Sequence, residues 1–231
     1  MSQPLSRCYS VQAKADKEAE VWIYEAIGEG WFGGISAKQF AKDIKELGDI
    51  EKITVRLNSP GGDVFEGNAI YNILKQHKAR VIVFIDGLAA SIASVVAMAG
   101  DEIYIADNAM MMIHNAWGFV MGYASDMRKA ADMLDKVDGS IVTTYMKRTK
   151  LDEQKIKDLM VAETWMNSKE ALENGFVDEI TDALEVAAYF DLSKFKYRNV
   201  PKRAPAKDER RNKLAHMSLV SQKLRIASNP R

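Results

Sequence analysis

Ser91 lies where a strongly apolar stretch gives way to a run of small residues. The stretch Arg80–Ile85 ends at Asp86-Gly87, and small residues with helical character continue from Ala89 to Ala99. A serine at such a strand-to-helix turn can expose its hydroxyl, with the first amides of the helix pointing the same way. This is the position of a nucleophilic serine. The alternative is that Ser91 is one more small residue that lets a helix pack closely on a sheet.

A nucleophilic serine also needs a base, and His114 is the candidate among three histidines. His77 is flanked by lysines and fits a solvated helix end, and His216 lies near the C-terminus. His114 follows the apolar residues Met110–Ile113, which we interpret as core or interface filling. A lone histidine there is more often a core residue than a base. A neighbouring nucleophile reverses that interpretation.

A second glycine-rich segment, Asn58–Val64, follows the β-branched stretch Ile53–Leu57. Its Gly61-Gly62 pair can adopt positive φ and expose backbone amides. An isolated Pro-Gly-Gly is usually a plain turn, and a phosphate loop is disfavoured because no Gly-Lys-Ser/Thr follows. Beside Ser91, the amide of Gly62 becomes a candidate oxyanion donor, and the second donor would be the amide of Ile92.

The elements that must position these residues alternate between strand and helix patterns. We expect strands at Glu20–Ile27, Ile53–Leu57, Arg80–Ile85 and Glu102–Ala106, and helices at Ala37–Leu47 after the N-cap Ser36, Phe65–His77 and Ser91–Ala99. This alternation predicts a parallel sheet covered by helices on both faces. Downstream we expect a long helix at Ala124–Lys147, shorter helices at Lys155–Val161 and Lys169–Glu173 (capped by Ser168), a brief extended piece at Thr164–Met166 and a strand at Phe176–Ile180.

Composition limits the partners and the compartment. The chain has 231 residues, with 32 basic and 32 acidic side chains, so net charge favours no nucleic acid. One cysteine, Cys8, forms no internal disulfide and suits a reducing cytosol. The polar N-terminus predicts no secretory signal, and the most apolar stretch, Leu88–Ala99, is too short to span a membrane. We expect a cytoplasmic protein without membrane or nucleic-acid partners.

Three segments are expected along the chain. Residues 1–19 lack periodicity and are predicted to be a flexible N-terminal arm or an edge element. Residues 20–192 form one domain. Residues 193–231 are basic and predicted to be a flexible tail, with one helix near Arg210–Leu224. No cluster has metal-ligand spacing and HExxH is absent, so no metal or organic cofactor is expected.

The order of these motifs resembles the ClpP serine peptidases, and in particular the phage-type ClpP-like proteases. The resemblance spans about Val21 to Ile180 and rests on these segments: Asn58–Val64, Gly87–Ser94, Met112–Asn115, Gly118–Met127, Glu163–Ala171 and Gly175–Asp178. It implies an α/β fold of the ClpP/crotonase type, a β-α-β spiral with a protruding helical handle.

The resemblance also implies roles for individual residues. Ser91 matches the nucleophile, His114 the general base, and Gly62 and Ile92 the two oxyanion donors. Glu163 stands where the family usually carries the aspartate of its triad, with Asp158 as the reserve candidate. The stretch after Gly62, predicted as a strand, and the residue after His114 would border a groove that holds substrate as an added strand: Asp63, Val64, Phe65 and Asn115.

The implied activity is that of a self-compartmentalising serine endopeptidase acting on polypeptides. Its implied partners are further copies in homo-oligomeric rings, and either an AAA+ unfoldase or phage capsid or scaffold proteins. The basic tail suits a phage prohead or head maturation protease. Two alternatives stay open at this point: a catalytically silent shell or scaffold protein, and a crotonase-type acyl-CoA enzyme, whose fold also offers paired oxyanion amides.

Overall fold

The computed structural model describes residues 9–14, 16–29, 33–183 and 192–201. The chain divides into two units, Met1–Asn199 and Val200–Arg231, and the fold below is that of the first. Nearly all of the predicted tail, including the helix expected near Arg210–Leu224, lies outside the described residues. In the part that the structure describes, no helix is long and apolar enough to cross a membrane.

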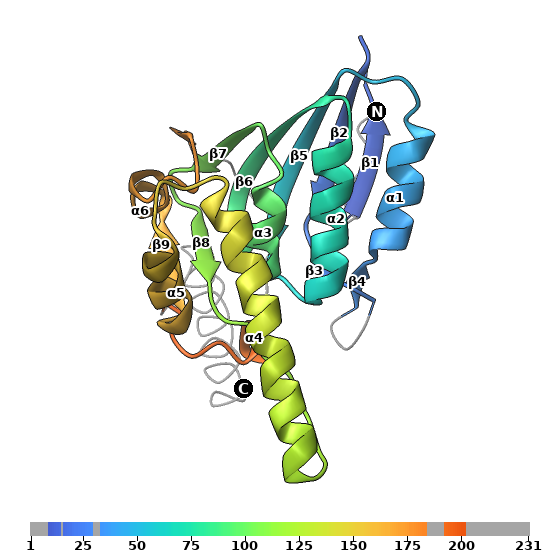
Figure 1. The fold of residues 1–231 in the computed structure, drawn as a ribbon. Coiled ribbons are helices and arrows are strands. Elements are labelled where there is room, and N and C mark those ends of the chain that lie inside the picture. The colour runs from blue at the N-terminus through green and yellow to red at the C-terminus, as the bar shows by residue number, and fades with distance from the viewer. Residues whose placement is uncertain (1–8, 15, 30–32, 184–191, 202–231) are drawn as a thin grey trace, which may run out of the picture. The chain divides into compact units, whose positions relative to one another are not determined.

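The predicted alternation of strands and helices is present (Figure 1). The strands are β1 (Tyr9–Ala13), β2 (Glu18–Ile23), β3 (Ala26–Ile27), β4 (Gly34–Ile35), β5 (Lys52–Ser59), β6 (Arg80–Ala90), β7 (Glu102–Ala106), β8 (Met110–Ile113), β9 (Thr164–Asn167) and β10 (Glu179–Thr181). The helices are α1 (Ala37–Glu46), α2 (Val64–Gln76), α3 (Ile92–Ala97), α4 (Ala124–Met146), α5 (Glu153–Val161), α6 (Ser168–Glu173) and the short 3₁₀ turn η1 (Leu192–Phe195).

Local capping explains where several helices begin. The Ser36 side chain accepts the Gln39 amide and starts α1, as predicted. The last short helix differs from prediction, because Asn167 rather than Ser168 is its N-cap and forms a capping box with Glu170. Ser168 instead donates a hydrogen bond to the carbonyl of Asp107. It therefore ties α6 to the loop after β7.

The main sheet runs in the order β1-β2-β5-β6-β7-β10. Neighbouring strands from β2 to β10 are parallel, and β1 pairs with β2 antiparallel. The β1 strand lies within the segment predicted to be an arm or an edge element. The described part of that segment is therefore largely an edge strand and not a flexible arm, because its backbone is paired along Tyr9–Ala13.

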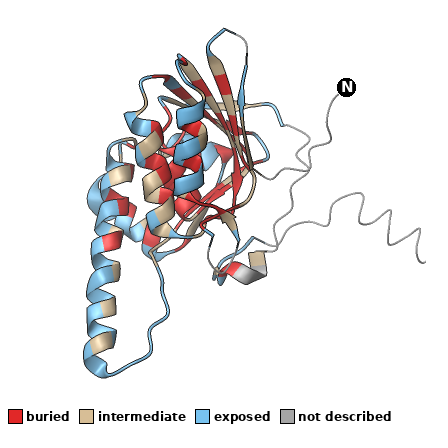
Figure 2. Ribbon diagram, turned by 90° about the vertical axis from the view of Figure 1, so that its right-hand side faces the viewer, coloured by how far each residue is buried: buried red, intermediate tan, exposed pale blue. Residues whose placement is uncertain are grey.

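For the part of the chain that the structure describes, the expectation of helices on both faces of the sheet is wrong. Helices α1, α2, α3 and α4 lie together on one face (Figures 1 and 2). The central strands alternate buried and half-buried residues, with Val55 buried and Arg56 half-buried. On the second face the Arg56 guanidinium lies over the rings of Phe84 and Trp22, 4.9 and 5.7 Å from their centroids. Stacked aromatic and arginine side chains thus cover what a helix was expected to cover.

Strand β6 is longer than predicted because it changes partner along its length. Its first part pairs with β7, ending at Ile85↔Ile105. Its second part, Leu88–Ala90, pairs with β8, a strand that the sequence analysis missed. The short β9 then pairs antiparallel with β8. Past Asp86-Gly87 the end of β6 stays paired with β5 at Ser59↔Ala89, and β8 takes the place of β7 at its other edge.

A buried ion pair lies at this change of partner. Asp86 is 2% exposed and accepts two hydrogen bonds from Arg56, at 2.8 and 2.5 Å. The hydroxyl of Tyr24 donates to the same carboxylate at 2.6 Å. Arg56 of β5 is thereby joined to Asp86 of β6, just after the last pair with β7, and to Tyr24, the residue that follows β2.

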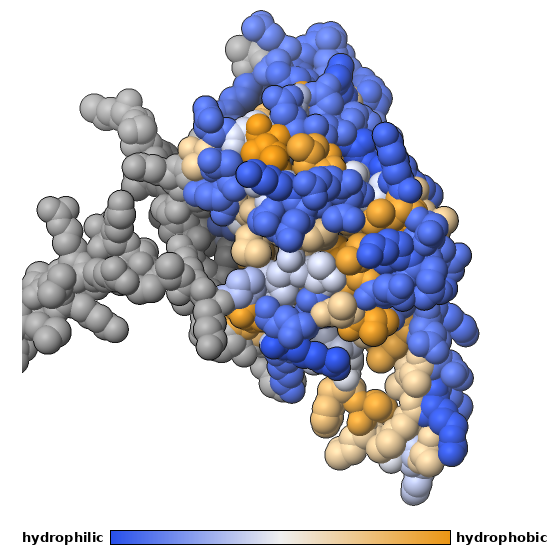
Figure 3. All heavy atoms as spheres, turned by 90° about the vertical axis from the view of Figure 1, so that its left-hand side faces the viewer, coloured by the Kyte–Doolittle hydropathy of each residue, from blue (hydrophilic) through white to orange (hydrophobic). Residues whose placement is uncertain are grey.

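Helix α4 projects from the rest of the unit like a handle (Figure 1). Only its second half packs against the core, through Val137, Ile141, Val142 and Tyr145. The first half and the loop before it leave large apolar side chains exposed (Figure 3), with Phe119 and Met121 at 85% and 86%. The predicted handle is therefore present, and its far end lacks a partner within the described chain.

We expect Asp86→Ala to destabilise the fold by about 3 kcal/mol, because it leaves the Arg56 charge unpaired and largely shielded from water. Urea unfolding followed by circular dichroism measures the change. Asp49→Ala is the matched control, because Asp49 pairs with Lys17 and Lys78 in full solvent. An Asp86 variant as stable as the Asp49 variant would contradict this role for the ion pair.

Candidate active site

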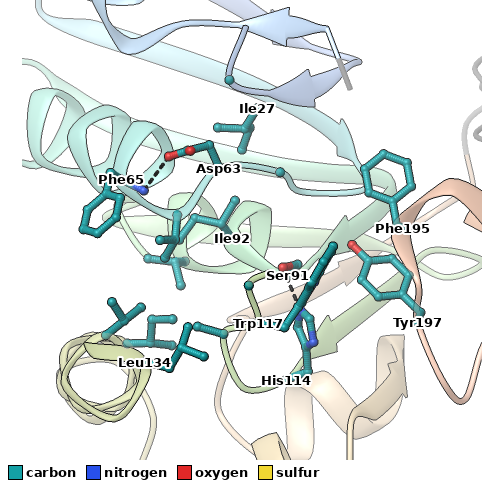
Figure 4. Close-up of a pocket in the computed structure, with 18 of the residues that line it drawn as sticks. Ile27, Asp63, Phe65, Ser91, Ile92, His114, Trp117, Leu134, Phe195 and Tyr197 are labelled. Atoms are coloured by element: carbon teal, nitrogen blue, oxygen red, sulfur yellow. Dashed lines mark hydrogen bonds between the residues drawn. The ribbon is translucent and has the colours of Figure 1, made fainter. Parts of the chain in front are cut away.

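Ser91 occupies a strained backbone position between β6 and α3. It is the N-cap of α3 with φ 56° and ψ −131°, a conformation that residues with a side chain rarely adopt. Its amide donates to the Met112 carbonyl, and its own carbonyl accepts from the Ser94 amide and hydroxyl. These bonds hold the turn and leave the Ser91 side chain facing a cavity (Figure 4).

His114 reaches Ser91 because β6 and β8 are parallel neighbours. Ala90 of β6 lies opposite Met112 of β8, so the residues that follow the two strands leave the sheet at the same end. The Ser91 Oγ and His114 Nε2 atoms are 2.8 Å apart, within hydrogen-bonding distance. The two residues that sequence spacing selected as nucleophile and base are therefore in direct contact (Figure 4).

The Gly61-Gly62 loop passes directly beside Ser91. A Cβ atom on Gly61 would lie 2.7 Å from the Ser91 Cβ and 3.3 Å from the Ile92 amide nitrogen, so only glycine fits there. Gly62 bridges to Ile27, whose carbonyl accepts the Asp63 amide. Among the described residues, the amides of Gly62 and Ile92 have no hydrogen-bond acceptor. Both residues line the cavity at Ser91, as two oxyanion donors must.

The residues predicted to border the substrate groove are only partly where we expected them. Asp63, Val64 and Phe65 do line the cavity, but no strand follows Gly62. Helix α2 begins at Val64, because the Asp63 carboxylate accepts the amides of Phe65 and Glu66 and caps it. This segment therefore offers no free strand edge for a peptide.

Asn115 lies behind His114 and not in the main cavity. Its side-chain amide and the Ala116 backbone amide both donate to Asp138 of α4, each at 2.7 Å. Asp138 thus ties the loop after His114 to the handle helix. The sequence held no signal for this residue, because Asp138 is one of many charged residues along the helix expected at Ala124–Lys147.

Glu163 is brought to His114 by the pairing of β8 with β9. Ile113 lies opposite Thr164, so the residues just beyond this pair, His114 and Glu163, are neighbours. Glu163 is 6% exposed and has φ 48°. In the described part of the chain, its carboxylate receives hydrogen bonds from the amides of Arg198 and Asn199 and from the Trp165 indole, and none from His114.

The reserve candidate, Asp158, points elsewhere. It lies on the exposed side of α5 and accepts a hydrogen bond from Gln154, one turn earlier. The structure therefore brings Glu163, and not Asp158, to the imidazole.

The cavity at Ser91 has a volume of about 420 Å³ and is mainly apolar on the side of α4. The wall on this side consists of Val95 of α3 and four residues of the handle helix α4: Leu134, Val137, Ile141 and Tyr145. The hydroxyl of Tyr145 bonds to Ser94 at 2.7 Å, and Ser94 in turn bonds to the Ser91 carbonyl at 2.5 Å. Neither Ser94 nor Tyr145 was selected from the sequence, because α3 and α4 meet only in the folded chain.

The electrostatics of His114 suit a base. Burial lowers the pKa of His114, Glu163 opposes that shift and Arg198 adds to it. The net direction is downward from the ordinary value near 6.5, so the imidazole is neutral at neutral pH. A neutral imidazole can accept the proton of a serine hydroxyl.

Comparison with known proteins identifies the class to which this fold and site belong. The sequence model of the Clp protease family matches residues 3–183, and the chain therefore belongs to that family. Over 178 residues it is 28% identical to the ATP-dependent Clp protease proteolytic subunit of Deinococcus radiodurans, covering 76% of this chain and 86% of the relative. The protein is a serine endopeptidase with the expected ClpP-type α/β fold. The acyl-CoA alternative thereby loses its support.

We expect the imidazole pKa of His114, measured by NMR titration, to lie below 6.5 and to fall further in Glu163→Gln. The carboxylate charge favours the protonated ring, so its removal disfavours protonation. His77 is the internal control, since its pKa is also lowered by burial and by Lys78, without Glu163. A His114 pKa that rises in Glu163→Gln would contradict this account.

Proposed function

We propose that this protein hydrolyses peptide bonds through Ser91 as nucleophile, His114 as base and Glu163 as the orienting acid. The observation that carries the proposal is the 2.8 Å contact between the Ser91 hydroxyl and His114 Nε2, beside two amides with no acceptor in the described chain. Nucleophile, base and oxyanion donors are the minimal set for acyl transfer.

In this mechanism the Ser91 Oγ attacks the peptide carbonyl while His114 Nε2 takes its proton. The carbonyl oxygen becomes an oxyanion between the amides of Gly62 and Ile92. The imidazolium then gives the proton to the leaving amine as the carbon–nitrogen bond breaks. Water, deprotonated by the same imidazole, cleaves the acyl-enzyme and restores Ser91. Glu163 stabilises the imidazolium that forms in both halves.

The apolar wall of the cavity indicates which side chain precedes the cleaved bond. Val95, Leu134 and Ile141 offer that side chain an apolar surface and no charged group. We therefore propose a preference for hydrophobic residues at this position.

The handle supports a proposal for assembly. Its exposed apolar residues would be covered by contacts with further copies of the chain, as in a homo-oligomeric ring or a pair of rings. A chamber formed in this way would admit unfolded polypeptide and exclude folded proteins. An AAA+ unfoldase, a phage head maturation role with capsid or scaffold substrates, and a cytoplasmic location stay predictions from the sequence.

We expect a fluorophosphonate probe to label Ser91, and Ser91→Ala to lose both labelling and peptide hydrolysis while keeping its fold. The reason is that the Ser91 hydroxyl is the one in contact with the base, His114 Nε2, among the described residues. Peptide mapping by mass spectrometry locates the label, and light scattering sizes the same sample. Ser125→Ala, at the exposed start of α4, is the control and should stay fully active. Ser91 that stays unlabelled both in the assembled wild type and in Tyr197→Ala, which removes a side chain lining the cavity, would favour the alternative of a silent scaffold.

We expect Glu163→Gln to lower kcat by about 10²–10⁴, by analogy with neutralised triad acids. The amide keeps the side-chain volume but loses the charge that stabilises the imidazolium. Asp158→Asn is the matched control, since that carboxylate is exposed and bonds only within α5 in the described structure. An unchanged kcat in Glu163→Gln together with a large loss of kcat in Asp158→Asn would show that Glu163 is not the orienting acid.

A further inference from the structure

The chain returns to the candidate active site after its last strand. Residues 192–199 lie against it, beginning with the turn η1, and Phe195 and Tyr197 line the cavity. Figure 4 shows both rings on the side of Ser91 opposite to Leu134. The Tyr197 ring contacts the His114 imidazole edge-on, with centroids 5.4 Å apart, and it also packs on Trp165 and Phe195. This segment thus covers the base.

The Tyr197 hydroxyl reaches the nucleophile and the glycine loop. It donates a hydrogen bond to the carbonyl of Pro60, the residue before Gly61-Gly62, and it interacts with the Ser91 hydroxyl. Burial raises the pKa of Tyr197, so the phenol stays neutral. A peptide that extends past Ser91 on this side would have to take the place of the phenol.

The same segment forms hydrogen bonds with both carboxylate oxygens of Glu163. The Arg198 amide donates to one carboxylate oxygen at 2.9 Å and the Asn199 amide to the other at 2.7 Å. The Asn199 side chain adds a bond to the Ala162 carbonyl at 2.9 Å. Charge-assisted bonds of this kind are strong, and here they bind the acid to the C-terminal segment while His114 has no bond to it.

We propose that residues 192–199 are an autoinhibitory latch that competes with polypeptide substrate for the Ser91 site and engages Glu163 while it is closed. The proposal rests on the proposed function of Ser91, His114 and Glu163. Because the latch belongs to the same chain, it acts at a high effective concentration. Substrate binds only the open fraction, so the latch raises the apparent KM and leaves kcat at saturation unchanged.

The test removes one latch bond in the full-length chain. Arg198→Pro deletes the amide that bonds Glu163, and Tyr197→Ala deletes the cover over Ser91 and His114. Each should lower the KM for a peptide substrate by up to about tenfold, the fold-change expected for one charge-assisted hydrogen bond, with kcat unchanged. Arg198→Ala is the matched control because it loses the same side chain and keeps the amide, so its KM should change less.

Val200→Pro controls for the effect of proline itself, since the Val200 amide bonds no described residue. A fall in kcat at constant KM in Arg198→Pro would mean that the segment positions Glu163, and would overturn the latch. Unchanged kinetics in both Arg198→Pro and Tyr197→Ala would overturn it as well.

Hydrogen–deuterium exchange separates failure of the latch from failure of the proposed function. The Arg198 and Asn199 amides should be protected in the wild type and exchange rapidly in Glu163→Gln, whether or not Ser91 reacts with the phosphonate. If Ser91 stays unreactive even in Tyr197→Ala and Arg198→Pro while these amides are protected in the wild type, the peptidase mechanism fails and the closed contact stands. If the amides exchange freely in the wild type, the latch is wrong.

Discussion

The change of partner within β6 is the constraint on which the site depends. If β6 kept β7 as its neighbour to its end, β8 would not lie beside Leu88–Ala90, and His114 would not be brought to Ser91. Past Asp86-Gly87, Leu88–Ala90 instead pair with β8. The Arg56–Asp86–Tyr24 cluster ties β6 to β5 and to the end of β2 at the residue just after the last β6–β7 pair. From there, ordinary backbone pairing sets the distance between the nucleophile and the base.

Backbone pairing also explains why the strained backbone of Ser91 and the close approach of Gly61 occur at this point. Ser91 takes a positive φ because the chain must turn at once from β6 into α3. Gly61 lies so close to Ser91 that a Cβ atom there would collide with it. The strain is tolerated because the turn is held by bonds to the Met112 and Ser91 carbonyls. The same geometry leaves two amides without acceptors in the described chain, ready for an oxyanion.

The segment after residue 183 adds contacts to the candidate active site that lie outside the match to the family. The match to the Clp protease family ends at residue 183, and the contacts with Glu163, His114 and Ser91 come from residues beyond that point. A catalytic unit with a covering segment of its own would be active only when that segment is displaced. Regulation would then act on the open fraction of the site and leave its chemistry unchanged.

The sequence by itself determined the alternation of elements and the strand-to-helix position of Ser91, because periodicity and capping are local. It also singled out His114 among three histidines, whereas Glu163 was selected only through the resemblance to a family. It missed β8 and the aromatic and arginine side chains on the second face of the sheet, and the resemblance implied a strand at Asp63–Phe65, where α2 begins. Asp138, Tyr145 and Tyr197 also escaped it. Each of these depends on contacts between residues far apart in the chain, and only the packed tertiary structure decides which side chains then share a site.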